Sequence, residues 1–441
     1  MMRRVLTGFV LAGVLLAIQA PAAQQGTTLA FVNVSVLPMD TDRVLTDQTV
    51  IVSKDRITAV GPAGSTQVPQ GATRIEGKGK YLMPGLAEMH GHIPAPTQPK
   101  QFTDDVLFMY VANGVTTVRG MQGAPGQLEL REAVNRGDLI GPTLYLAGPG
   151  FTGNAVKAPE DARARVQEQK KEGWDLLKVL PGLTVEVYDA MARTAKDVDI
   201  PFAGHVPDAV GVPHALEMGQ ETIDHIDGYA EHLGGQTKPV DDKGVQDLVA
   251  RTKKSGTWIV PTLVVWETLR GPITLESRTS LPELRYLPRD LVAQWTKAVG
   301  NRLKSDQYNQ DHARQYIDNR MRIMTALHKG GVGILLGSDA PQQFNVPGFS
   351  IHPEMKRMTD AGMSPYDVIR SGTASVGQYY KGRDQFGTIA AGQRADLILV
   401  DANPLQDLAN IQKRSGVVVR GRWLPESEIQ KRLKDIEGRN Q

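Results

Sequence analysis

The chain of 441 residues contains no cysteine. Disulfide bonds are therefore excluded, and so is a lipid-modified cysteine near the N-terminus. An excess of charge of one sign is also lacking, because 50 Lys and Arg stand against 48 Asp and Glu. That balance gives no indication of nucleic acid or an anionic membrane as a partner. Low-complexity tracts and solenoid repeats are absent from the sequence as well.

Apolar runs long enough to span a bilayer are missing, since the run at residues 5–18 is short. Arg3 and Arg4 precede this run, and the small residues Ala20-Pro21-Ala22 follow it. This pattern predicts a signal peptide over residues 1–22 that is removed on export. Its removal leaves 48 basic and 48 acidic residues. We therefore expect an exported, periplasmic protein with no membrane attachment after processing.

Three segments differ in pattern. Residues 27–81 hold short strand-like runs separated by Gly, Pro and Asp, which is typical of a β-sandwich. Residues 82–385 alternate strand-like and helix-like runs, the pattern of βα units. Residues 386–425 return to strands and are expected to complete the N-terminal domain. The sequence thus predicts an α/β protein in which both chain ends build one small, discontinuous domain.

A long polar stretch at residues 266–320 interrupts the alternation. It follows the strand-like run Trp258–Val264, so we expect it to project over the catalytic end of the βα units. Two interpretations stay open: a lid over the active site, or a helical elaboration packed on the outside.

The segment Met83–His92 combines an apolar run, a Pro-Gly break and two histidines. Residues two apart on a strand point to the same face, so His90 and His92 can reach one point in space. Neutral imidazole is a common ligand of zinc and similar ions. The pair therefore predicts part of a metal site at the end of a strand.

Four further candidate ligands lie in or at the end of apolar, strand-like runs. They are Lys178, His205, His225 and Asp339. Strand ends followed by small residues are where a parallel α/β barrel keeps its active site. Lys178 has a second interpretation, in which its stem lies on apolar surface and its ammonium group reaches water.

This set of motifs resembles the amidohydrolase superfamily of metal-dependent hydrolases, over nearly all of the chain after residue 27. The resemblance implies a (β/α)8 TIM barrel (residues 82–385) with a small β-sandwich built from both chain ends. It implies two divalent metal ions, most simply zinc, with a carbamylated Lys178 bridging them. His90, His92 and Asp339 would hold one ion, and His205 and His225 the other. One departure is Glu88, since the family usually has Asp two residues before the first histidine.

Weaker candidates complete the site. Asp339 is placed to move a proton between water and the leaving amine, and the resemblance assigns it that role. Tyr229 would donate a hydrogen bond to the developing oxyanion, or else be a packing residue at the barrel rim. His352 and Arg119 are candidate substrate-binding residues, although a structural salt bridge is an equal alternative for Arg119. The other histidines, expected to be solvated or capping residues, are His214, His232, His312 and His328.

The run Gly204–Pro207 together with Gly219–His225 resembles an exported branch related to imidazolonepropionase and Xaa-Pro dipeptidases. The resemblance implies hydrolysis of an amide bond in a dipeptide or N-acyl amino acid by metal-activated hydroxide. The alternatives are a cyclic-amide or lactone hydrolase and, outside catalysis, a silent binding protein on the same fold. The only partner expected is the small-molecule or dipeptide substrate, and homo-oligomerisation is left open.

Overall fold

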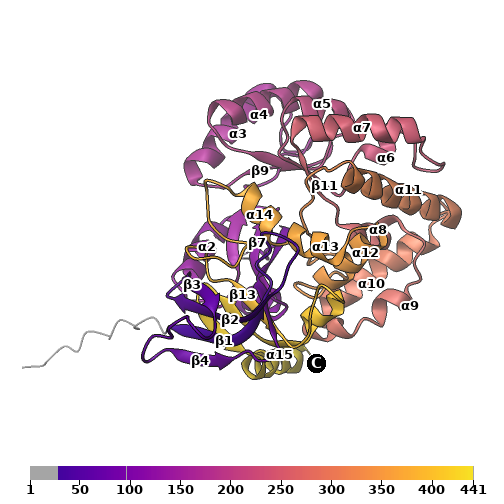
Figure 1. Cartoon of the computed structure of the whole chain (residues 1–441). Helices are drawn as coiled ribbons and strands as arrows, with labels where there is room; N and C mark the ends of the chain where they lie inside the picture. The colour runs from indigo at the N-terminus through magenta and orange to yellow at the C-terminus, as the bar shows by residue number, and fades with distance from the viewer. Residues whose placement is uncertain (1–27, 96, 441) are drawn as a thin grey trace, which may run out of the picture.

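A computed structural model describes residues 28–95 and 97–440. The expected signal peptide lies outside these residues. The strands of both chain ends gather at one end of the molecule with helix α15, while α3, α4, α5 and α7 lie at the opposite end (Figure 1). The mixed α/β class predicted from the sequence is confirmed.

Both chain ends contribute strands to a single eight-stranded sheet. Its order is β15-β14-β13-β5-β1-β2-β3, and β4 pairs with β1 off this path. The strands are β1 (Leu29–Val36), β2 (Leu45–Ser53), β3 (Arg56–Pro62), β4 (Thr73–Glu76), β5 (Tyr81–Pro84), β13 (Leu397–Val400), β14 (Arg414–Val419) and β15 (Arg422–Pro425). The sheet joins the two ends as expected, but a two-sheet sandwich is not confirmed by this arrangement.

The central strands form two parallel sheets in the described chain. One sheet has the order β6-β7-β8 and the other β12-β11-β10-β9. Their strands are β6 (Leu86–Gly91), β7 (Val115–Gly120), β8 (Thr143–Leu146), β9 (Leu177–Val179), β10 (Phe202–Gly204), β11 (Thr222–Asp224) and β12 (Trp258–Val260).

Backbone hydrogen bonds join the edges of these two sheets. Asp175 N donates to Leu146 O at 2.9 Å, which links β8 to β9. Leu335 N donates to Ile259 O at 2.9 Å, and Met89 N donates to Leu336 O at 2.8 Å. Residues 333–336 therefore connect β12 to β6, although the sheets as assigned among the described residues do not include a closed barrel.

Helices follow most of the central strands. They are α1 (Lys100–Ala112), α2 (Gln127–Asn135), α3 (Pro159–Glu172), α4 (Val185–Asp197), α5 (Gly211–Glu217), α6 (Tyr229–His232), α7 (Asp242–Ser255), α8 (Leu263–Arg270), α9 (Glu276–Thr279), α10 (Arg289–Lys304), α11 (Gln310–Lys329), α12 (Ile351–Asp360), α13 (Pro365–Ser371), α14 (Ala374–Tyr379) and α15 (Glu426–Asn440), with short 3-10 helices at Pro282–Tyr286 (η1) and Leu408–Gln412 (η2).

Helix α3 shows how directly the sequence sets some of these bounds. Pro159 occupies the first helical position, where its missing N–H is no loss. Acidic residues fill the first turn and Lys170 and Lys171 the last, in agreement with the helix dipole. Gly173 ends the helix at a φ of 92°, a left-handed conformation that glycine adopts without strain.

The stretch from residue 266 to 320 is helical, but it begins differently from the prediction. Leu263 and Val264 were expected to end a strand, whereas they open helix α8. The reason is Thr262, whose φ of 43° turns the chain sharply after β12. Helices α8, α10 and α11 lie together on one side of the molecule (Figure 1).

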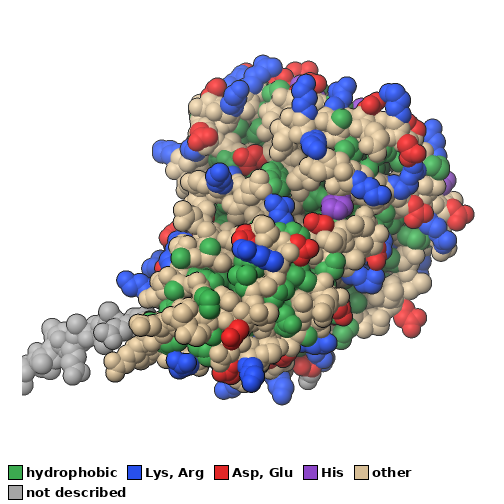
Figure 2. Space-filling view, in the orientation of Figure 1, with side chains coloured by type: hydrophobic (Ala, Val, Ile, Leu, Met, Phe, Trp, Pro, Cys, Tyr) green, Lys and Arg blue, Asp and Glu red, His purple; other side chains and the backbone are tan. Residues whose placement is uncertain are grey.

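Acidic and basic side chains are interspersed over the face of the molecule shown in Figure 2. This agrees with the near-zero net charge of the sequence. Among the described residues, no helix is both long enough and apolar enough to cross a bilayer.

Candidate active site

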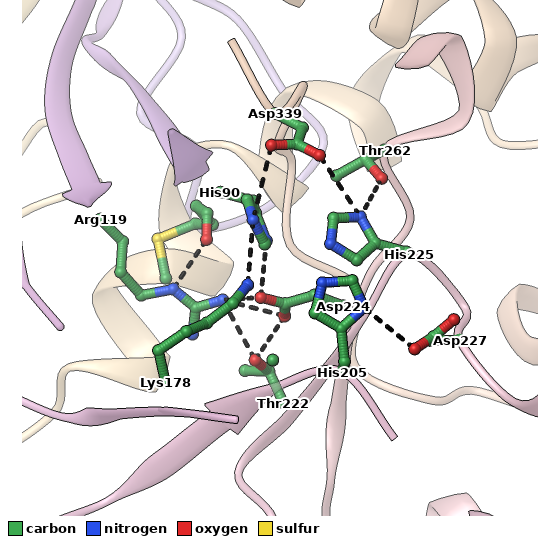
Figure 3. Close-up of polar contacts among 12 residues, drawn as sticks. His90, Arg119, Lys178, His205, Thr222, Asp224, His225, Asp227, Thr262 and Asp339 are labelled. Carbon is green, nitrogen blue, oxygen red and sulfur yellow. Dashed lines mark hydrogen bonds and ion pairs between the residues drawn. The ribbon is translucent and has the colours of Figure 1, made fainter. Parts of the chain in front are cut away.

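The structure brings all six predicted metal ligands together. His90 lies near the end of β6 and Lys178 in β9. His205 and His225 directly follow β10 and β11, and Asp339 follows residues 333–336 (Figure 3). The His90 and His225 rings have centroids 4.4 Å apart, and those of His205 and His225 are 4.6 Å apart. The ends of neighbouring parallel strands thus collect the ligands at one point.

Asp339 is the carboxylate at the centre of this cluster. Its Oδ1 atom lies 2.7 Å from Nε2 of His92 and 3.6 Å from Nε2 of His90. One donor atom each from His90, His225 and Asp339 lie within 4.8 Å of one another, and all three residues are buried. Two imidazoles and a carboxylate at such spacing fit a divalent cation such as zinc.

Lys178 lies inside the cluster. Its side chain is 1% exposed, and its Nζ atom is 3.2 Å from Nε2 of His90. Burial lowers the pKa of Lys178 from 10.5 to about 8, because the charged form loses its hydration. The alternative in which the ammonium group reaches water is therefore wrong.

Asp224 is a buried acid that the sequence analysis did not single out. Its Oδ2 atom lies 2.7 Å from Nδ1 of His90, and its carboxylate also accepts hydrogen bonds from Arg119 and Thr222 (Figure 3). The only signal in the sequence was its place directly before His225. A carboxylate behind a ligating histidine fixes the ring and its tautomer.

The structure decides between the two interpretations of Arg119. The side chain is 0% exposed, and it donates to Asp224 and to the backbone oxygen of Met89. No substrate carboxylate reaches a guanidinium buried in this way. Arg119 is a structural partner of Asp224, and its prediction as a substrate-binding residue is wrong.

Two other histidines of the cluster also have partners that hold their rings. His205 Nδ1 lies 3.0 Å from Oδ2 of Asp227, and His225 Nδ1 lies 2.7 Å from Oγ1 of Thr262. Burial lowers the pKa of His90 and His225 well below 6.5. Both rings are therefore neutral at pH 7, the form that binds metal.

An unusual backbone explains how neighbours in the sequence share this site. His225 has a φ of 66° and Asp339 also has a φ of 66°, in the left-handed region that non-glycine residues rarely adopt. In a regular strand, Asp224 and His225 would point to opposite faces. The turn at His225 brings both side chains to the cluster. Such strained positions are often found at functional sites.

Glu88, the departure from the family pattern, connects two ligand-bearing segments. Its carboxylate accepts hydrogen bonds from the backbone N–H groups of His90 at 3.1 Å and Ser338 at 2.7 Å. Burial raises the pKa of Glu88 to about 8. The longer side chain therefore still ties the segment of His90 to the segment of Asp339.

The structure places Tyr229 away from the cluster, so its prediction as an oxyanion donor is wrong. The side chain is fully buried, and its hydroxyl lies 2.6 Å from Oγ1 of Thr252 in α7. Gly228, with a φ of 79°, starts helix α6 at Tyr229. The packing alternative describes this residue correctly.

His352, the second candidate substrate-binding residue, does not lie on a loop at the cluster. It lies in the first turn of α12, and this helix packs on η2 and α8. Burial and the nearby Arg414 lower the pKa of His352 to about 3. Among the remaining histidines, His214 lies 2.7 Å from a carboxylate oxygen of Asp189, outside the cluster.

Comparison with known proteins agrees with this geometry. The profile of the amidohydrolase family matches residues 81–424. A 5-methylthioadenosine/S-adenosylhomocysteine deaminase from Caldanaerobacter subterraneus subsp. tengcongensis is 23% identical over 403 residues, which cover 84% of this chain and 84% of the deaminase.

Solved structures of similar fold include an amidohydrolase and a dipeptidase. Bottromycin amidohydrolase has a TM-score of 0.74 at 23% identity, over 93% of this chain and 90% of that one. A Xaa-Pro dipeptidase with bound methionine has a TM-score of 0.68 at 20% identity, over 90% of this chain and 100% of that one. At these identities the likeness concerns the fold. Because the family profile covers most of the sequence, the chain belongs to the amidohydrolase family, whose members are metal-dependent hydrolases acting on C–N bonds.

Proposed function

We propose that this protein hydrolyses the amide bond of a dipeptide or an N-acyl amino acid with the help of two divalent metal ions, most simply zinc. The observation that carries the proposal is the position of Lys178, with Nζ 3.2 Å from Nε2 of His90 in a cluster of four histidines and a carboxylate. A buried amine among metal ligands has a clear use as the precursor of a bridging ligand.

The donor set divides into two groups on this proposal. His90, His92 and Asp339 would hold one ion, and His205 and His225 would hold the other. Bound divalent ions would polarise the scissile carbonyl and lower the pKa of a water molecule. Asp224, Asp227 and Thr262 orient three of the imidazoles through their second nitrogen atoms.

Lys178 would supply the sixth ligand after reaction with carbon dioxide. The neutral amine attacks the carbon of CO2, a C–N bond forms, and one proton leaves to solvent, which gives a carbamate of charge −1. Burial favours this step because the lowered pKa of Lys178 increases the fraction of neutral amine. The carbamate would replace a buried ammonium group by an anionic ligand.

Asp339 serves as the proton shuttle. Its carboxylate takes the proton of the attacking water and gives it to the nitrogen as the C–N bond breaks. Gln342 donates to Oδ2 of this carboxylate at 3.3 Å, and Oδ1 lies 2.7 Å from Nε2 of His92, its neighbour in the ligand set. Tyr229 has no part in this scheme.

Two finer features of the molecule belong to the same proposal. We propose that residues 82–385 form a closed (β/α)8 barrel, supported by the hydrogen bonds that join the edges of the two parallel sheets. We also propose that the protein is exported and processed after residue 22. N-terminal sequencing of protein recovered from the periplasm tests the second point, and recovery of unprocessed protein from the cytoplasm would contradict it.

The decisive experiment combines metal analysis with a substrate screen. The purified holoenzyme should contain two equivalents of metal per chain and release amino acids from a panel of dipeptides and N-acetyl amino acids. The same screen should include cyclic amides, lactones and purine nucleosides, since turnover of these alone would favour a lactone, cyclic-amide or deaminase activity. One equivalent of metal together with an unmodified Lys178 in the mass spectrum of the native protein would contradict the binuclear site.

A further inference from the structure

Two adjoining cavities lead away from the metal-ligand cluster. The inner cavity, of about 700 Å³, is lined by His205 and Asp227 on one side and by Trp266, Arg270 and Tyr316 on the other. The outer cavity, of about 360 Å³, lies between α8, α10 and α11. Both are lined by Arg270, Tyr316 and Gln236. A substrate bound at His205 therefore has a path to the outer cavity along α8.

Stacked aromatic and cationic side chains form one wall of this path. The guanidinium of Arg270 lies 5.6 Å from the ring centre of Tyr316, and that of Arg320 lies 5.5 Å from the same ring. The Tyr316 hydroxyl is held in turn by Glu231, at 2.7 Å. Cation–π contacts of this kind limit the movement of a long side chain. Arg270 is therefore held beside the path by an anchored ring.

Arg270 carries a charge that no acid of the described chain neutralises. Its side chain is exposed, and over residues 28–95 and 97–440 it forms no ion pair or hydrogen bond with the protein. In the inner cavity, Asp227 is engaged with His205 and Glu231 with Tyr316. A third acid, the exposed Asp208, also lines this cavity, and among the described residues none of the three forms an ion pair with Arg270.

The outer cavity has a positive lining. Arg270 and Arg302 both contribute to it, and none of its lining residues is acidic. Arg302 is used structurally, because it donates to the backbone oxygen of Gly271 at the end of α8. Arg270 is thus the side chain free to bind a ligand, and its planar fork of N–H groups matches a carboxylate.

We propose that Arg270 binds a carboxylate at the end of the substrate remote from the scissile bond. This inference rests on the proposed amide hydrolysis and narrows its substrates to those that carry a free carboxylate able to reach the outer cavity. Arg270 is then a specificity-determining residue. Because this contact forms in the bound substrate and persists in the transition state, it acts on KM and leaves kcat unchanged.

The test uses pairs of N-acyl amino acids that differ only in this group, with the metal-loaded enzyme. The far end of the acyl chain carries a carboxylate in one member of the pair and a primary amide in the other. Wild type should show a lower KM for the acid than for the amide. Arg270→Gln should raise the KM for the acid on the order of 10- to 100-fold, the range of a charge-assisted hydrogen bond. It should leave the KM for the amide unchanged. Arg270→Lys should fall between the two, because it keeps the charge but loses the fork.

Arg314→Gln is the matched control. Arg314 is also exposed, lies on α11 two residues before Tyr316, and lines neither cavity. The control removes the same charge and should leave both KM values unchanged. An equal effect of Arg270→Gln on acid and amide, or an effect of Arg314→Gln as large as that of Arg270→Gln, would overturn the carboxylate site and leave amide hydrolysis intact.

The two proposals fail in different ways. If the metal-loaded wild type cleaves neither member of any pair, amide hydrolysis is rejected. Calorimetric binding of the acid and the amide then still tests Arg270, because tighter binding of the acid that Arg270→Gln abolishes supports the site. Equal binding of acid and amide by wild type overturns it.

Discussion

Atom Nδ1 of His90 lies 2.7 Å from Oδ2 of Asp224, and both side chains are buried. Because the ring donates its proton there, the lone pair of its other nitrogen, Nε2, is directed to the ligand cluster. Asp224 is held in turn by Arg119, which donates to both of its oxygens at 3.1 and 3.2 Å. An ion pair in the interior thus fixes the orientation of a metal ligand.

Asp224→Asn should weaken metal binding. The amide oxygen of Asn accepts from His90 less strongly than a carboxylate, so metal affinity should fall on the order of 10- to 100-fold. Dialysis against graded chelator concentrations, followed by metal analysis, measures this change, and turnover should fall in parallel. Asp189→Asn is the matched control, because Asp189 lies 2.7 Å from the His214 ring outside the site. Metal retention in Asp224→Asn equal to that in the control would show that the contact does not tune the ligand.

Lys178→Ala should lose at least one metal ion and nearly all turnover. The alanine leaves a space that a free carboxylic acid can enter, so formate or acetate should restore part of both metal content and activity. The same acids added to wild type give the control and should produce no gain. Turnover of the alanine variant equal to wild type, without added acid, would mean that Lys178 has only a structural role.

Tyr229→Phe and Asp339→Asn should differ sharply. Tyr229→Phe removes a hydrogen bond between the tyrosine hydroxyl and Thr252. Because Thr252 still donates to Leu248 O at 2.8 Å, we expect the free energy of unfolding to fall by only about 1 kcal/mol. Its kcat should stay within about twofold of wild type. Asp339→Asn removes a metal ligand and the proton shuttle, and should lower kcat by on the order of 10³-fold or more. A large fall in kcat for Tyr229→Phe would show that Tyr229 takes part in catalysis.

Glu354 should make the stability depend on pH. Its buried carboxyl group accepts from Leu263 N and Val264 N at the start of α8, and burial raises its pKa from 4.5 to about 8. Between these values the folded state binds more protons than the unfolded state, so this contribution to stability is complete below pH 4.5 and is lost as the pH rises through 8.

Thermal unfolding of wild type and Glu354→Gln between pH 5 and 9 measures this effect. The Tm of wild type relative to the variant should fall as the pH rises. The same substitution at the exposed Glu276 controls for the pH dependence of the rest of the chain. A Tm difference between wild type and Glu354→Gln that is independent of pH would contradict the raised pKa.

The ligand set could be predicted because each member is a metal-binding type of residue in an apolar run that ends a strand. His90, Lys178 and Asp339 are separated widely in the sequence, but parallel strands end at one edge whatever their separation. The helix over Pro159–Glu172 could be predicted equally well, because its first proline, the charged residues of its first and last turns and Gly173 are local signals.

The residues that contact the ligands, such as Asp224, could not be predicted in this way. Asp224 precedes His225, and strict alternation along a strand would place the two side chains on opposite faces. A histidine in the sequence gives no indication that its backbone will adopt a positive φ, as His225 does. The positions expected for Tyr229 and His352 were wrong for a related reason. The spacing of a residue from a ligand does not show whether the chain continues as a loop or starts a helix.

The shared sheet also has a consequence for biosynthesis. Strand β1 pairs with β5, and β5 pairs with β13, which lies near the C-terminus. The ribosome must therefore have made nearly the whole polypeptide before the early strands can find their last neighbours. Residue Gly85 alone separates β5 from β6, the strand that carries His90. His90 therefore lies directly after a sheet that is complete only when β13 has been made, although its own strand β6 pairs with the early strand β7.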